Sequence, residues 1–400
     1  MSDPRARRFM FLLGWVSLFA DLCHEGMRSI LGPYLTMLGA SATAVGVVAG
    51  TGEAVGYILR YVTGSLADRT QRYWALTIAG YATNLIAVPL LALAGSWPAV
   101  AALVGLERLG KAVRSPAKST LTSFVAKRVG AGRVFAIVEA MDQTGALLGP
   151  LLVAAVLAWR GATASGFAWA FALLGIPAAV TLLILARARH LYPDPRKLEE
   201  EAPAGAEQAT LGPRYTLYLV GAALVAVGLA DWPLLAYHLQ GAGVIGAKWL
   251  PIAYAAAMGA DGLASLAAGL MFDRSRSRGG TGAGVIAVFV ILGAAYAPLV
   301  FGADATTPWI AIAGIALWAI ARAATESIGK ALIAAIVPPG ARGRAYGLYY
   351  LVWGGAWWAG SVALGALYDH ARGWTSVLAL GSMCAGATVI AISARRRRAE

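Results

Sequence analysis

Residues 64–74 read GSLADRTQRYW, and residues 269–279 read GLMFDRSRSRG. Each stretch follows a long apolar segment, and the first glycine and the aspartate four residues later coincide in the two. Further along each half, GAGRVFAI at 130–137 matches GARGRAYGL at 340–348. Two matching pairs in the same order predict an internal parallel repeat, a construction that many membrane transport folds share.

The composition indicates a protein that lies in lipid. The chain has 400 residues, of which 59% are hydrophobic and 13% are charged, whereas soluble domains are about 25% charged. Apolar segments recur that are long enough to cross about 30 Å of hydrocarbon. We therefore expect an all-α polytopic membrane protein with twelve helices, at 9–38, 42–68, 73–94, 97–127, 131–159, 163–187, 213–240, 244–272, 280–302, 306–335, 341–369 and 373–393.

The net charge of +13 follows the expected topology. Lys and Arg gather in every second segment between helices, while LGASAT, AGSWPA, LQGAGV and FGADATT hold almost none; Arg160 and Arg372 are the main exceptions. This alternation predicts that both termini lie in the cytoplasm and that the chain resides in the plasma (inner) membrane. It also argues against a nucleic-acid partner. The basic start PRARRFM leads into a first membrane helix rather than a cleavable signal peptide.

One long polar stretch separates the two halves. Its proline, glutamate and alanine content is typical of a solvated linker. We expect an N-terminal six-helix bundle at 1–190, a cytoplasmic linker at 191–212 and a C-terminal six-helix bundle at 213–400.

The segment from Gly64 to Arg72 resembles the helix 2–3 loop signature of the major facilitator superfamily, G-x-L-a-D-R-x-G-R-R/K. Gln71 replaces the usual glycine, and Tyr73 replaces the final basic residue. The resemblance implies two six-helix bundles that work by alternating access, with helices 1, 2, 4, 5, 7, 8, 10 and 11 around a cavity. It also implies an inter-helix latch, so we expect a gating role for Gly64, Asp68, Arg69, Arg72, Asp273 and Arg274.

Two further segments resemble motifs of this family. Arg108 fits the arginine of the helix 4 motif R-x-x-Q-G, although Lys111 stands in place of glutamine and Ala112 in place of glycine. GALLGP resembles the G-x-x-x-G-P core of the helix 5 antiporter signature. This resemblance implies export by antiport and adds Gly145, Gly149 and Pro150 to the expected gating residues.

Charged residues recur on single faces of the predicted helices. A charge at the bilayer centre costs at least about 2.5–3.5 kcal/mol, so such residues are expected to face a wet cavity or to pair. In helix 4, Glu107, Lys111, Arg114 and Lys118 form one stripe, in which Glu107 could neutralise Lys111 and Lys118 could extend to the headgroups. We expect secondary transport of a small polar or charged organic solute, coupled to protons, and the basic residues favour an anionic one. The expected substrate-binding residues are Arg28, Arg60, Arg108, Lys111, Arg114, Arg322, Glu326, His238 and Trp353.

Acidic residues on the same helices are candidate proton carriers. A carboxylate that exchanges partners during the transport cycle can take up and release a proton, whereas a static buried ion pair explains the same residues without transport. The candidates are Asp21, Glu25, Glu53, Glu139, Asp142, Asp231 and Asp261.

Other functions remain as alternatives. The principal one is proton- or ion-coupled uptake of an organic anion or other metabolite. The run from Cys23 to Glu25 holds metal-ligand types, but adjacent helical residues diverge, so metal transport is the weaker interpretation, as is a membrane-embedded enzyme or receptor. We expect no enzyme activity, no cofactor and no bound metal, and a monomer whose partners are the small-molecule substrate, protons and the lipid bilayer.

Overall fold

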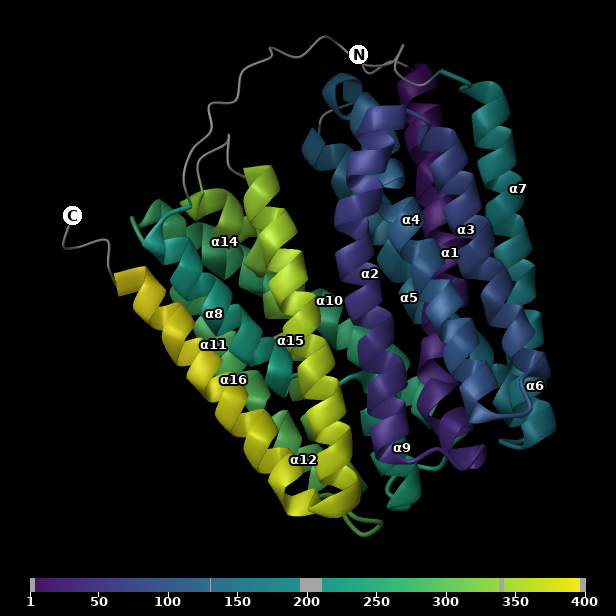
Figure 1. Ribbon diagram of the computed structural model, residues 1–400, viewed down its shortest axis with the longest axis vertical. Coiled ribbons are helices and arrows are strands. Elements are labelled where there is room, and N and C mark those ends of the chain that lie inside the picture. The colour runs from purple at the N-terminus through teal and green to yellow at the C-terminus, as the bar shows by residue number, and fades with distance from the viewer. Residues whose placement is uncertain (1–3, 130, 195–210, 338–341, 396–400) are drawn as a thin grey trace. The chain divides into compact units, whose positions relative to one another are not determined.

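The computed structural model describes residues 4–129, 131–194, 211–337 and 342–395 (Figure 1). Within these ranges the regular structure is helical and no strand occurs, so the predicted all-α fold is confirmed. The first half contains α1 (Pro4–Met37), α2 (Ala42–Thr70), α3 (Tyr73–Leu90), η1 (Leu91–Leu93), α4 (Trp97–Val129), α5 (Ala131–Arg160), α6 (Ala164–Leu173) and α7 (Gly175–Leu191).

The second half is more often interrupted. It contains α8 (Pro213–Gly228), α9 (Trp232–Gly241), α10 (Leu250–Ser277), α11 (Ala283–Ala294), α12 (Tyr296–Phe301), α13 (Pro308–Ala323), the π-helical turn η3 (Ala324–Ile328), α14 (Gly329–Ile336), α15 (Arg342–His370) and α16 (Arg372–Arg395).

Several predicted helices are broken in the structure. The helices expected at 163–187, 213–240 and 280–302 each divide into two, and the one at 306–335 contains the π-helical turn. α10 begins six residues later than expected, because the preceding chain forms turns in which Gly243 has φ +70°. At the break between α8 and α9, the Tyr296 hydroxyl accepts from Ala230 N at 2.8 Å and donates to Gly228 O at 2.7 Å. The buried backbone groups that the break leaves without helical partners are thus satisfied, as a membrane interior requires.

Eight helical stretches of the described residues are long and apolar enough to cross a membrane. Four other long helices do not meet these criteria of length and composition: α1, α2, α4 and α15. Two of these, α1 and α4, carry most of the buried charges of the first half. Their low hydropathy therefore marks polar interior faces.

The chain forms two compact units. Unit 1 comprises Met1–Leu38, Val55–Pro203 and Ala247–Ala255, and unit 2 comprises Gly39–Ala54, Ala204–Gly246 and Ala256–Glu400. α2 and α10 are therefore each divided between the units. The expected domain boundaries stay a prediction, and residues 195–210 of the expected linker lie outside the described part of the chain.

In unit 1, glycines bring helix backbones into close contact. α3 packs on α4, where a Cβ on Gly110 would lie 2.6 Å from Gly80 O. α1 packs on α5, where a Cβ on Gly149 would lie 2.8 Å from Gly26 N, and Gly145 is one turn away in the same contact. Small residues at such crossings allow close helix packing, so the polar residues of α3 lie close to those of α4, and α1 lies close to α5.

In unit 2, α8 packs on α16 through Gly221 and Gly386. The start of α2 is held by α15, because the Asp369 carboxylate accepts from Ala42 N at 3.0 Å and from Thr43 N at 2.8 Å. This carboxylate caps a helix of which it is not part and satisfies amides that would otherwise lack helical partners.

Candidate functional site

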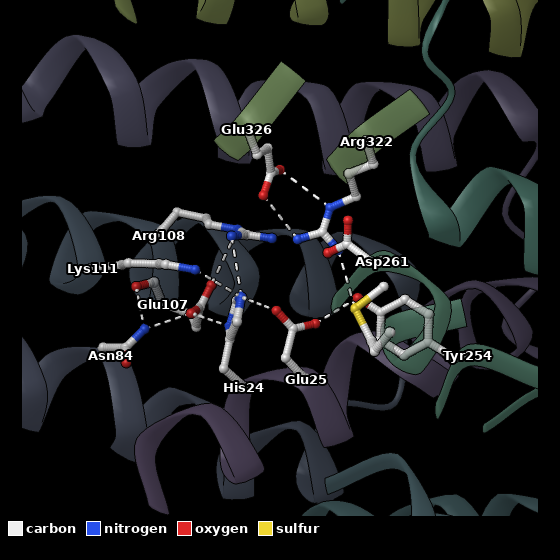
Figure 2. Close-up of polar contacts among 11 residues, drawn as sticks. His24, Glu25, Asn84, Glu107, Arg108, Lys111, Tyr254, Asp261, Arg322 and Glu326 are labelled. Carbon is white, nitrogen blue, oxygen red and sulfur yellow. Dashed lines mark hydrogen bonds and ion pairs between the residues drawn. The ribbon is translucent and has the colours of Figure 1, made fainter. Parts of the chain in front are cut away.

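Charged side chains from α1 and α4 are buried in unit 1. Such charges are tolerated in a membrane only where they are paired, hydrogen-bonded or hydrated. The close α3–α4 packing at Gly80 and Gly110 fixes the spacing of the polar residues around it. We define the unit 1 polar cluster as the residues of this unit labelled in Figure 2: His24, Glu25, Asn84, Glu107, Arg108, Lys111 and Tyr254.

His24 lies at the centre of this cluster and is fully buried. Its Nδ1 lies 2.9 Å from Oε1 of Glu107, and its Nε2 lies 3.0 Å from Nζ of Lys111. An ammonium group only donates hydrogen bonds, so Nε2 accepts and Nδ1, which faces the carboxylate, carries the hydrogen. The two charged partners therefore select one tautomer of a neutral imidazole.

Glu107 is contacted from two further sides (Figure 2). The side-chain amide of Asn84 donates to Oε1 at 2.5 Å and to the Glu107 backbone carbonyl at 3.0 Å. Nε of Arg108 lies 3.3 Å from Oε2. The carboxylate thus contacts His24 and Arg108, and Lys111 reaches the opposite nitrogen of His24.

Glu25 is connected to the beginning of α10. The Tyr254 hydroxyl donates to Oε2 of Glu25 at 2.5 Å, and both residues are buried. Oε1 of the same carboxylate lies 3.9 Å from Nε2 of His24. Residues 247–255 belong to unit 1, so this contact lies within that unit.

A second group of polar contacts joins α1, α4 and α5. Nζ of Lys118 donates to Oγ of Ser17 at 2.5 Å and lies 4.0 Å from Oδ1 of Asp142. The carboxyl groups of Asp142 and Asp21 are close enough to interact with each other. Two carboxylates that face each other repel, and protonation of either one removes this repulsion. We call Asp21 and Asp142 the carboxyl pair.

The buried charge of unit 1 is positive. The Arg114 guanidinium lies 4.2 Å from the ring centroid of Tyr81, a cation–π contact. Among the described residues of this unit, the buried charged side chains are three arginines and two glutamates (Arg28, Arg108, Arg114, Glu25 and Glu107). The half-buried charged side chains of this unit balance one another, with Arg60, Lys111 and Lys118 positive and Asp21, Asp142 and Asp194 negative. In a low-dielectric interior the positive excess among the buried side chains favours an anion.

Unit 2 holds a smaller cluster around Arg322, which we call the unit 2 polar cluster. Nε and one terminal nitrogen of Arg322 donate to the two oxygens of Glu326 at 3.2 and 3.0 Å, a bidentate pair. The other terminal nitrogen donates to Sδ of Met258 at 3.1 Å and lies 3.9 Å from Oδ2 of Asp261. Glu326 lies in the π-helical turn, a distortion that is frequent at functional sites.

Other predicted residues of unit 2 lie in separate groups. Asp231 is buried at the α8–α9 break and accepts from Trp357 Nε1 at 2.9 Å and from Ser361 Oγ at 3.1 Å. Trp353 is buried, with its ring centroid 5.7 Å from those of Tyr349 and Trp357. These contacts place both residues in the packing around α15.

His238 belongs to yet another set of contacts. Its Nε2 donates to the backbone carbonyl of Val300 at 2.8 Å, and its Nδ1 is contacted by the Tyr368 hydroxyl and by Arg372. No contact with Arg322 is found among the described interactions of His238. A shared role of these two residues in substrate binding stays a prediction.

The remaining predicted residues are distributed over both units. The Arg60 guanidinium lies 5.0 Å from the Tyr57 ring centroid, and Glu139 is exposed and accepts from Gln143. Glu53 is buried, Gly145, Gly149 and Pro150 lie on the buried face of α5, and the charged residues Arg69, Arg72, Asp273 and Arg274 are exposed. The burial of Gly64 and Asp68 lies outside what the structure describes.

Sequence reasoning left four contacting residues out of the expected site: His24, Asn84, Glu107 and Tyr254. Glu107 was expected only to neutralise Lys111, and His24 was considered within the run of metal-ligand types from Cys23 to Glu25. Asn84 had a usable signal, since it is the only amide in the otherwise apolar segment 76–106. Tyr254 had none, because an aromatic residue near a helix end is ordinary at a membrane interface. Among the described residues, no group of three or more His, Cys, Asp or Glu could hold a metal ion.

Comparisons with known sequences identify relatives of this chain. The chain is 39% identical over 380 residues to an uncharacterized protein of Mycobacterium tuberculosis, Rv2265. The aligned region covers 94% of this chain and 90% of that protein. It is also 30% identical over 193 residues to the fosmidomycin resistance protein of Escherichia coli. The aligned region covers 46% of this chain and 45% of that protein.

Comparisons of structure and family agree. The peptide transporter POT in complex with sulfate superposes with a TM-score of 0.76 at 15% identity, covering 98% of this chain and 95% of that one. The nucleoside transporter NupG superposes with a TM-score of 0.73 at 12% identity, covering 97% and 99%. Residues 15–237 match the sequence profile of the Major Facilitator Superfamily. The chain therefore belongs to the Major Facilitator Superfamily and has the fold of its secondary transporters.

Proposed function

We propose that this transporter moves a small organic anion across the membrane by alternating access, in exchange for protons and in the direction of export. The observation that carries this proposal is the positive excess of the buried charges in unit 1. A transporter for cations would be expected to show the opposite balance among the buried charges of this unit.

The geometry around His24 supports an anion. Both Nζ of Lys111 and a terminal nitrogen of Arg108 approach the same Nε2, at 3.0 and 3.5 Å. One neutral nitrogen with one lone pair is a weak acceptor for two cations. A carboxylate or phosphonate group of a solute would accept from both cations more strongly, because charge-assisted hydrogen bonds are about twice as strong as neutral ones.

The carboxyl pair supports proton coupling. Asp21 and Asp142 interact with each other, a single proton would remove the repulsion between their carboxylates, and Lys118 lies 4.0 Å from Asp142. A shift of Lys118 toward either carboxylate would favour release of that proton, and a shift away would favour its uptake. The name of one relative, fosmidomycin resistance protein, supports export as the direction.

Reconstituted vesicles test the proposal. Purified protein is inserted into liposomes that contain a pH-sensitive dye, and fosmidomycin, a phosphonate, is the first solute in a panel of organic anions. We expect solute movement with opposite proton movement that is absent from protein-free liposomes. Solute and protons moving in the same direction would support the uptake alternative. Movement of cations or sugars, with none of any anion, would refute the anion assignment.

A further inference from the structure

A cavity of about 580 Å³ lies at one end of unit 1, between the first turns of α1 and the end of α7. It shares no residue with the unit 1 polar cluster or the carboxyl pair. We call it the α1–α7 pocket; its lining residues are Pro4, Arg5, Arg8, Leu191, Tyr192, Pro193 and Asp194.

The walls of this pocket are fixed by hydrogen bonds and ring contacts. The Tyr192 hydroxyl donates to the backbone carbonyl of Arg5 at 3.0 Å, and Nε1 of Trp74 donates to the carbonyl of Tyr192 at 2.9 Å. The ring of Phe9, fully buried, lies 4.8 Å from that of Tyr192 and 6.0 Å from that of Trp74. These contacts come from α1, α3 and the end of α7, and they hold the chain that leaves α7 against the start of α1. The pocket is therefore already formed in the absence of a ligand.

The pocket combines charge with apolar surface. Arg5 and Arg8 are three residues apart and so lie on one face of α1. With Asp194 the lining carries a net charge of +1, and the remaining lining residues are apolar or aromatic. The volume is in the range of small-molecule sites and exceeds what a bare phosphate ion would fill. The pocket therefore suits an amphiphile with one negative charge.

Its position narrows the class of amphiphile. The pocket lies where α1 begins and where α7, part of the candidate membrane span Ala164–Leu191, ends. The ends of membrane-spanning helices are where headgroups are expected. The charge pattern of the sequence predicts that this end faces the cytoplasm, where basic pockets recognise anionic lipid headgroups.

We propose that the α1–α7 pocket binds an anionic phospholipid, with Arg5 and Arg8 holding the phosphate and with Leu191 and Tyr192 against its apolar part. The site lies apart from the proposed transport pathway. It attaches the start of α1, the helix that carries His24, to the membrane surface.

Native mass spectrometry of the full-length protein in detergent tests this site. Phosphatidylglycerol is titrated against phosphatidylcholine for the wild type, for the double variant Arg5→Gln/Arg8→Gln and for Arg7→Gln. Arg7 is exposed in the same turn but does not line the pocket, so it is the matched control. Each pocket arginine is expected to contribute about fivefold, so phosphatidylglycerol should bind the double variant about 25-fold more weakly and the Arg7 variant less than twofold more weakly.

Three outcomes would overturn the proposal. Equal weakening in the Arg7 variant and the double variant would indicate a diffuse basic surface. Equal binding of phosphatidylcholine would remove the requirement for net negative charge. Inorganic phosphate or glycerol phosphate binding as tightly as the lipid would assign the pocket to a free phosphate compound. Thermal unfolding of each variant verifies that the compared proteins are folded.

Discussion

Nδ1 of His24 lies 2.9 Å from Oε1 of Glu107, and this contact joins α1 to α4 in the interior of unit 1. The carboxylate determines which imidazole nitrogen carries the hydrogen, so the opposite nitrogen can accept from Lys111. A change at Glu107 would therefore alter the surroundings of Lys111 through the histidine ring.

Two substitutions of His24 separate its contacts. In His24→Asn the amide nitrogen takes the place of Nδ1, which lies 2.9 Å from the Glu107 carboxylate, and can donate a hydrogen bond to it. In His24→Gln the longer side chain takes the place of Nε2 and leaves no donor beside Glu107. A hydrogen bond to a charged group contributes about 1.5–3 kcal/mol. We expect His24→Gln to be less stable than His24→Asn by this amount, measured by thermal unfolding in detergent. Equal stabilities would show that the Glu107 contact contributes little.

The sequence predicts the α1 and α4 faces well, for a physical reason. A charge in a membrane helix is costly, so its position and helical spacing report which face is buried among polar groups. Partners across helices do not follow from spacing. Glu107 was expected beside Lys111 on its own helix, yet it contacts His24 of α1 and Asn84 of α3. Close packing at Gly80 and Gly110 brings α3 against α4 at this point.

Lys111→Gln tests anion binding. The change removes one charge near Nε2 of His24 and keeps a donor of similar length. We expect the solute concentration for half-maximal transport to rise about tenfold to hundredfold, as for loss of a charge-assisted hydrogen bond. Lys248→Gln is the control, because Lys248 is exposed and lies beside the Trp249 ring, outside the cluster. Equal effects of the two substitutions would contradict a specific role for Lys111.

Asp142→Asn tests the carboxyl pair. The amide can hydrogen-bond to Asp21 but cannot exchange a proton with it. We expect vesicles with this variant to lose solute-driven proton movement and to retain exchange of labelled for unlabelled solute. The control is Asp304→Asn in the loop before α13, where hydrogen bonds from the side chain and backbone of Thr306 hold the pKa of the Asp304 carboxyl below its usual range. Proton movement that persists in Asp142→Asn would assign coupling to another group.

Other parts of the site left no readable pattern in the sequence. The break between α8 and α9 occurs inside an apolar run that fits one continuous helix, and the tyrosine that satisfies it, Tyr296, lies far along the chain. The π-helical turn at Glu326 is likewise set by tertiary packing. Propensity and periodicity describe one helix at a time, whereas these features depend on what a neighbouring helix supplies.

Gly110→Ala tests whether α3–α4 packing positions the polar cluster. An added Cβ would lie 2.6 Å from Gly80 O and would press on the backbone of Asn84, whose amide donates to Glu107. Overpacking of this kind costs about 1–3 kcal/mol, so we expect a lower unfolding temperature and weaker solute binding together. Gly105→Ala on the same helix is the matched control, because a Cβ there meets nothing within 4 Å, and alanine favours a helix by up to about 1 kcal/mol. If both variants were equally stable, the close α3–α4 contact would not be what holds Asn84 against Glu107.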